Sequence, residues 1–94
     1  MAHIMIRHKV KDFSTWKPFF DKNGAMRGKA GCKGGYIFHS EDNPNDVAVI
    51  FDWDNIDNAK KFAQSSQLRD AMQKAGVQGA PEVYFLDSEG RFSQ

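Results

Sequence analysis

The order in which two kinds of apolar periodicity follow one another constrains the fold of this 94-residue chain more than any other feature. Residues 2–10 alternate with a period of two, which is typical of a β-strand. Residues 12–30 instead place apolar side chains at spacings of three and four, as an amphipathic helix does. The same criteria predict three further strands, at residues 32–40, 47–53 and 82–86, and a second helix over residues 54–76.

One proline and one glycine mark the ends of the first helix. Pro18 is tolerated only in the first turn of a helix, because proline lacks a backbone N–H. We therefore expect the regular helix to begin at Ser14 or Thr15. Gly31 suits the left-handed conformation that commonly ends a helix, so the helix is expected to end there.

Three other boundaries are marked by turn formers and breakers. Residues 41–46 are rich in turn formers and predict a hairpin loop between the second and third strands. Ser65 and Ser66 predict a break within the second helix. Pro81 is expected to precede the fourth strand.

The resulting order, strand, helix, strand, strand, helix, strand, is that of the split-βαβ or ferredoxin-like fold. We predict an α+β protein with a βαββαβ order: a four-stranded antiparallel sheet with two helices on one face. In this fold the third strand lies between the first and the second. The chain is short for even one domain of about 150 residues. We therefore expect a single domain over residues 1–94, with a core at 3–87 and a polar tail at 88–94.

Composition argues against several classes of protein. No apolar run approaches the roughly 20 residues of a membrane span, so no membrane partner is expected. A net charge of +1 does not call for nucleic acid as a partner. The single Cys32 excludes a disulfide within the chain and fits a reducing compartment, so the cytoplasm is the expected location.

The strands leave no consistently polar face for the predicted sheet. Met5, Tyr36, Phe38 and residues 47–53 supply apolar side chains on both sides. If helices cover one face, the other is a large exposed apolar surface, which predicts association. A two-fold homodimer that packs sheet on sheet is the simplest solution.

Three groups of residues together resemble a known family. They are RHKV at 7–10 with Asp12, Phe13 and Trp16; SEDNPND at 40–46 leading to VIFDWD at 49–54; and Ala59, Phe62, Leu68, MQKAGV at 72–77 and Pro81. Over about residues 3–87 the chain resembles the dimeric α+β barrel superfamily. Within it, the chain is similar to small proteins of the antibiotic biosynthesis monooxygenase (ABM) domain type.

The resemblance implies a homodimer whose two sheets form a shared barrel. It also implies a pocket in each subunit, between the sheet and the helices. Relatives include cofactor-free oxygenases that act on aromatic quinols, haem-degrading oxygenases and isomerases, and many have no known activity. The match is specific for the fold and weak for the reaction.

His8 is the candidate catalytic residue. It is the polar member of an otherwise apolar alternation with Ile4, Ile6 and Val10. If that face points toward the helices, the imidazole is a candidate acid or base near neutral pH. The alternative is a hydrogen-bonded histidine with a structural role.

The candidate substrate-binding residues are mainly aromatic. In cofactor-free relatives a Trp, an Asn and an Arg orient a phenol, and Trp53 could be that Trp or a core aromatic. Asn23, Arg27 and Arg69 are candidates for the other two positions. We expect the substrate to contact Trp53, Tyr36, Phe62, Met72 and Arg27.

We expect neither a metal nor a cofactor. His8 and His39 would lie two strand spacings apart, roughly 10 Å, which is too far for one zinc ion. Haem-degrading relatives place the iron-ligating His on the second helix, and residues 55–76 contain no His.

Two functions remain open. The first is a cofactor-independent monooxygenase acting on a small aromatic, quinol-type substrate in an apolar pocket. The alternative is a non-catalytic homodimer that binds a small molecule or a protein. RNA binding is disfavoured, because the third strand is acidic and the net charge is near zero.

Overall fold

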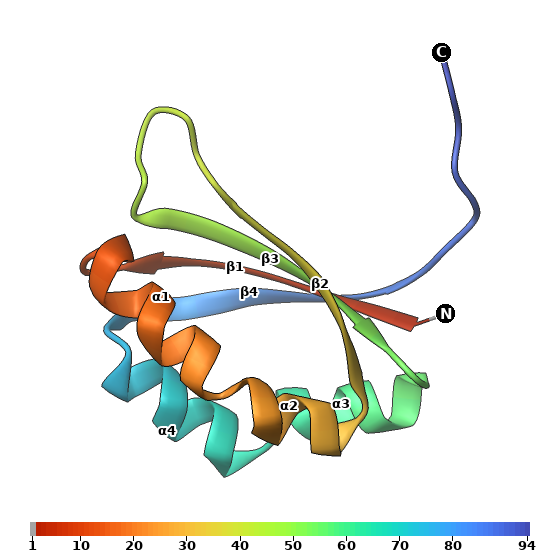
Figure 1. The fold of residues 1–94 in the computed structure, drawn as a ribbon, viewed down its shortest axis with the longest axis horizontal. Coiled ribbons are helices and arrows are strands. Elements are labelled where there is room, and N and C mark those ends of the chain that lie inside the picture. The colour runs from red at the N-terminus through yellow and green to blue at the C-terminus, as the bar shows by residue number, and fades with distance from the viewer. Residues whose placement is uncertain (1) are drawn as a thin grey trace.

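A computed structural model describes residues 2–94 of the chain. Its elements, in order, are β1 (Ala2–Val10), α1 (Phe13–Lys22), α2 (Gly24–Ala30), β2 (Cys32–His39), β3 (Asp46–Trp53), α3 (Ile56–Ala63), α4 (Ser66–Lys74) and β4 (Val77–Asp87). The four helices lie on one face of the sheet (Figure 1). The predicted α+β class and ferredoxin-like order are confirmed, with each expected helix divided into two pieces.

The sheet has the strand order β2-β3-β1-β4, and every pairing is antiparallel. β3 therefore lies between β1 and β2, as predicted. Each side of the sheet is built from cross-strand rows, of which Ile37–Val49–Ile6–Val83 is one on the helix side. The neighbouring row Tyr36–Ile50–Met5–Tyr84 is on the opposite side, because adjacent residues of a strand point to opposite faces.

The core lies between the sheet and the helices. The alternation of β1 turns Ile4, Ile6, His8 and Val10 inward, and all four are buried. β3 contributes Val47, Val49, Phe51 and Trp53, and the helices contribute Trp16, Ala59 and Phe62. The face of β1 that carries His8 therefore does point toward the helices.

The first helix begins at Phe13, not at Ser14 or Thr15 as predicted, and Pro18 lies inside it. Its start is held by the amide of Phe13, which donates to the side-chain oxygen of Asn45 at 2.8 Å. This contact across the sheet could not be predicted from local sequence. Pro18 is exposed, and the helix continues past it at the cost of one backbone hydrogen bond.

Breaks in both helical segments lie over the sheet. Asn23 separates α1 from α2, although one helix to residue 30 was expected. Ser65 separates α3 from α4, which confirms the predicted break. The Ser65 hydroxyl accepts the amide of Leu68 at 3.2 Å and donates to the carbonyl of Phe62 at 2.8 Å, so it ends one helix and caps the next. The first segment ends as predicted at Gly31, with a φ of 124°.

The fourth strand is longer than predicted, because it runs from Val77 to Asp87 and includes Pro81. β4 is an edge strand that pairs only with β1, so a missing N–H on its free side costs no ladder bond. The register shifts between Arg7 and Lys9, so that His8 lies opposite a bulge that contains Pro81. Pro81 therefore does not end the strand, and the regular pairing with β1 resumes at Glu82.

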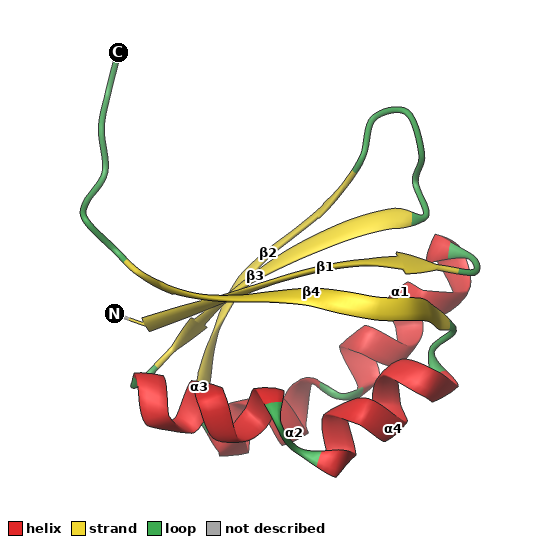
Figure 2. Cartoon of the chain, turned by 180° about the vertical axis from the view of Figure 1, so that it is seen from behind, coloured by secondary structure: helices red, strands yellow, loops and turns green. Residues whose placement is uncertain are grey.

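The sheet face away from the helices, called the open face below, is apolar in its middle. It carries Met5, Tyr36, Phe38, Ile50, Tyr84 and Leu86. After β4 the tail of residues 88–94 leaves the sheet and extends on the side of the open face (Figures 1 and 2). Within residues 2–94, no helix has the length and hydropathy that a membrane crossing requires.

Candidate functional site

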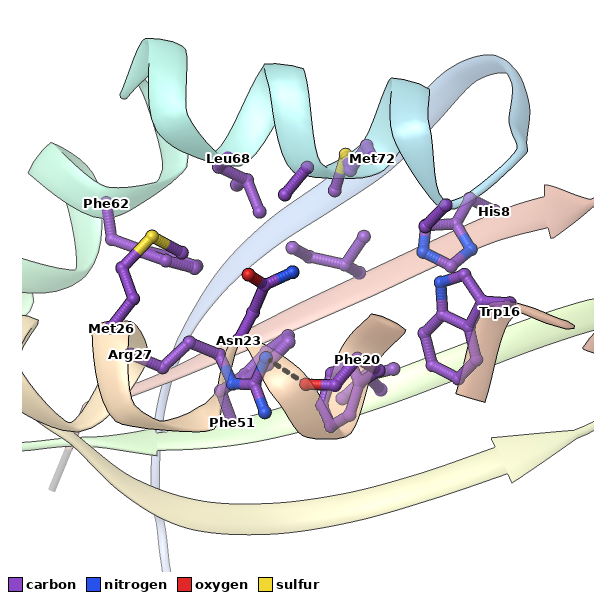
Figure 3. Close-up of a pocket in the computed structure, with 14 residues that line it drawn as sticks. His8, Trp16, Phe20, Asn23, Met26, Arg27, Phe51, Phe62, Leu68 and Met72 are labelled. Carbon is purple, nitrogen blue, oxygen red and sulfur yellow. Dashed lines mark hydrogen bonds between the residues drawn. The ribbon is translucent and has the colours of Figure 1, made fainter. Parts of the chain in front are cut away.

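A cavity of about 50 Å³ lies between the sheet and the helices, beneath the two helix breaks. Every helix and both central strands contribute to its wall (Figure 3). The lining residues are Ile6, His8, Trp16, Phe20, Asn23, Met26, Arg27, Val49, Phe51, Phe62, Leu68, Ala71, Met72 and Ala75. Of the predicted site residues, the structure brings together His8, Arg27, Phe62 and Met72.

His8 provides the titratable group nearest to neutral pH in this wall. Its side chain is held by the middle of β1, and the residue is only 7% exposed. Within the described chain, Nδ1 is buried without a hydrogen-bond partner. Burial lowers the pKa of the imidazole from its ordinary value of 6.5, and the charge of Asp46 opposes this effect more weakly. The imidazole is therefore neutral at pH 7 and can accept a proton.

Trp16 of α1 forms the wall next to His8. The two rings meet edge to face, with centroids 5.7 Å apart and planes at 74°. The edge of the indole that carries its nitrogen is turned toward His8 (Figure 3). Trp16 is buried in the core, and in addition it places an N–H donor beside the imidazole.

Asn23 and Arg27 bring polar groups from the α1–α2 break to the other end of the cavity (Figure 3). Asn23 extends toward the centre of the cavity between the two layers. Nη1 of Arg27 donates to the carbonyl of Phe20 at 2.8 Å, and its guanidinium carbon lies 3.8 Å from the centre of the Phe20 ring. Burial lowers the pKa of Arg27, yet the group remains charged.

No Asp or Glu is among the described residues that line the cavity. The positive charge of Arg27 therefore has no acidic partner in this wall. Such an environment favours a ligand with an anionic or strongly accepting oxygen. The rest of the wall is apolar, with three phenylalanines (Phe20, Phe51 and Phe62) and two methionines (Met26 and Met72) suited to a flat ring.

Two predicted substrate-binding residues lie elsewhere. Trp53 is fully buried behind Phe62, with ring centroids 4.9 Å apart, and it does not line the cavity. Tyr36 is on the open face, is 67% exposed and stacks on Phe38. A bulge between Cys32 and Gly34 shifts the alternation of β2 and so places Tyr36 on this face. Arg69 lines a neighbouring groove and not the cavity.

That neighbouring groove, of about 410 Å³, is open and runs between α4 and β4. Leu68 and Met72 line both the groove and the cavity, so these two side chains separate them. Both side chains are flexible, and Met in particular adapts to different neighbours. A change of rotamer at Met72 would therefore enlarge the space available to a ligand.

The histidines do not form a metal centre. Val47 of β3 lies between His8 and His39 in the same cross-strand row. Across residues 2–94, no cluster of three or more His, Cys, Asp or Glu side chains is placed to hold a metal ion.

Comparison with known proteins finds matches for the fold but none for the sequence. No family model and no curated protein matches the chain. Among solved structures, an antibiotic biosynthesis monooxygenase superposes with a TM-score of 0.72 at 12% identity, covering 96% of this chain and 100% of that one. A Bordetella bronchiseptica protein provisionally classed with the same enzymes gives a TM-score of 0.77 at 17% identity, covering 93% and 95% of the two chains.

A further match is SnoaB of Streptomyces nogalater, a cofactor-independent oxygenase. It has a TM-score of 0.77 at 12% identity, and the alignment covers 99% of this chain and 97% of SnoaB. Over its whole length, the chain therefore has the fold of the antibiotic biosynthesis monooxygenases, as the sequence resemblance predicts.

Proposed function

We propose that this protein is a cofactor-independent monooxygenase that oxidises a small electron-rich phenol in the cavity, with His8 as the base. The observation that carries the proposal is a neutral, buried imidazole in an apolar cavity whose wall also holds the hydrogen-bond donors of Asn23 and Arg27. The fold shared with a cofactor-independent oxygenase supports the same reaction class. The cavity of about 50 Å³ is smaller than the roughly 150 Å³ of an apolar cavity that holds benzene, so a single ring would enter with a shift of side chains such as Met72.

The reaction begins with the transfer of the phenol proton to the imidazole of His8. The phenolate then gives one electron to dioxygen, and the resulting radical and superoxide combine at a ring carbon. The imidazolium returns its proton to the peroxide. The O–O bond then breaks as the ring carbon loses its hydrogen, which leaves a quinone and water. One oxygen atom of O₂ enters the product and the other leaves as water.

Asn23 and Arg27 stabilise the phenolate that forms in this reaction. The donors lie at the end of the cavity away from His8 (Figure 3). A second oxygen on the ring would accept from them while the first faces His8. Such donors are most effective where a bound ligand displaces water from between apolar walls.

Oxygen uptake with a panel of hydroquinones and naphthols tests the proposal. We expect one O₂ to be consumed per quinone formed, and His8→Gln to lower kcat roughly 100-fold or more, the range for loss of a general base. His39→Gln, which changes an exposed histidine, is the matched control. Full turnover by the His8→Gln variant would refute the role of His8.

A non-catalytic binding protein is the second candidate, and it is favoured because, within the described residues, Nδ1 of His8 has no hydrogen-bond partner that would orient the imidazole as a base. This function predicts that phenols raise the melting temperature without any oxygen uptake. Binding with equal affinity by the wild type and by His8→Gln would add support, because a base is not needed for binding alone.

We also propose that the protein works as a homodimer joined through the open face. Met5, Tyr36, Phe38, Tyr84 and Leu86 form an apolar surface that a single protomer leaves uncovered. Monomeric proteins rarely expose contiguous apolar surface of this kind. A second copy presents the same residues and therefore covers them symmetrically.

A further inference from the structure

We propose that the tail of residues 88–94 binds the second subunit of the homodimer, with Phe92 as its anchor. This inference rests on the homodimer proposed above and adds a segment to its interface. The tail was expected to be only a polar extension of the domain. Its one large apolar side chain, Phe92, is 84% exposed in the protomer, more than any other large apolar residue described.

The direction of the tail is the first supporting observation. It continues from the end of β4 and extends away from the helices, on the side of the open face (Figures 1 and 2). Its one described hydrogen bond is internal, from the amide of Gly90 to the hydroxyl of Ser88 at 3.3 Å. A second copy seated on the open face would therefore meet the tail alongside it.

The second observation concerns the part of β4 from which the tail extends. Tyr84 and Leu86 are exposed on the open face, while Val83 and Phe85 are exposed on the helix side. β4 is also an edge strand with no neighbour on its free side. Edge strands that are apolar on both faces promote uncontrolled association unless something covers them. Sheet-on-sheet packing covers the open face, and the tail, which extends from the end of β4, is the segment placed to cover the free edge of this strand.

The size of the interface also favours participation of the tail. A stable interface engages roughly 20–30 residues from each partner. Residues 88–94 would add seven residues from each subunit to the contact that the apolar and polar residues of the open face make. Glu89 and Arg91 carry opposite charges, so the tail brings no net charge to an apolar surface.

Sedimentation equilibrium of the protein over residues 1–94 tests the role of Phe92. Burial of two phenylalanines per dimer predicts that Phe92→Ala raises the dimer dissociation constant roughly 100-fold. Ser93→Ala, a neighbouring change that removes no apolar surface, should leave the constant unchanged. Because Phe92 lies outside the core, both variants should keep the wild-type circular dichroism spectrum.

Limited trypsin digestion gives an independent readout, because cleavage after Arg91 releases residues 92–94. We expect intact-mass spectrometry to show protection that rises with protein concentration and follows dimer formation. Protection that is equally strong in the monomer would mean that the tail folds onto its own subunit, and would overturn the inference.

The two proposals fail in different ways. A wild-type protein that stays monomeric at all concentrations would refute the homodimer itself. A wild-type dimer that Phe92→Ala does not weaken, with Arg91 cleaved at the same rate in monomer and dimer, would refute the role of the tail and leave the homodimer standing.

Discussion

His8 makes the stability of the folded protein depend on pH. Burial holds its pKa in the folded state below the ordinary value of 6.5 that applies in the unfolded chain. Between these two values the unfolded state binds more protons, so acid favours unfolding. The stabilisation from neutral His8 is complete above pH 6.5 and is lost as the pH falls toward the folded-state pKa.

We therefore predict that the free energy of unfolding falls between pH 7.5 and pH 5, by at most about 1.4 kcal/mol per pH unit from this one proton. Urea denaturation across this range measures the slope. His8→Gln should reduce the slope, whatever its effect on stability at neutral pH, while His39→Gln should not. An unchanged slope in His8→Gln would show that another group is responsible.

Ser65 lies between α3 and α4, and its hydrogen bonds explain why the second helical segment is divided there. Its hydroxyl caps α4 and also bonds to the last turn of α3, whereas the next residue, Ser66, is exposed within α4. We predict that Ser65→Ala lowers the free energy of unfolding by about 1 kcal/mol, as the loss of an N-cap does. Ser66→Ala should be neutral or slightly stabilising, because alanine has the higher helix propensity. Equal effects of the two changes in urea denaturation would contradict the capping role.

The elements also show what could be predicted from sequence and what could not. β1 follows a period-two pattern directly, whereas β3 was recognisable from a run of β-branched and aromatic residues that is apolar on both faces. The extension of β4 through Pro81 depends on its place at the sheet edge, which only the assembled fold determines. The position of Tyr36 was missed for a related reason, since a single inserted residue in β2 reverses the alternation.

The site was also predicted only in part: His8 was found from the sequence, and the tryptophan of the cavity wall was not. His8 stood out because a polar residue interrupts an apolar alternation, and the structure places it in the cavity wall. Trp53 was expected to contact the substrate because of the family resemblance, and local sequence could not show that a helix residue would separate it from the cavity. Trp16 lines the cavity and Trp53 does not, because Phe62 of α3 packs between Trp53 and the cavity.

For the whole molecule, a charge on the open face should separate the subunits. Tyr36 is largely exposed in the protomer, so Tyr36→Glu should leave the melting temperature of the monomer almost unchanged. In the proposed dimer it buries an unpaired charge in each subunit, and we predict that the dissociation constant rises roughly 100-fold or more. Gln67→Glu on α4, on the far side of the molecule, is the control for sedimentation equilibrium. A dimer equally tight in both variants would place the interface elsewhere.

The division of each helical segment also determines how a molecule can enter a cavity that is closed on most sides. An isolated helix shorter than about 12–15 residues is marginal in water, so α2, with seven residues, two glycines and no buried side chain, is held only by its neighbours. Its local opening would uncover Met26 and Arg27 without disturbing the sheet. Amide hydrogen exchange should therefore be roughly tenfold or more faster in α2 than in α3, which is anchored by Ala59 and Phe62. A bound phenol should slow exchange in α2 first, so that this short helix reports occupancy of the cavity before any product is formed.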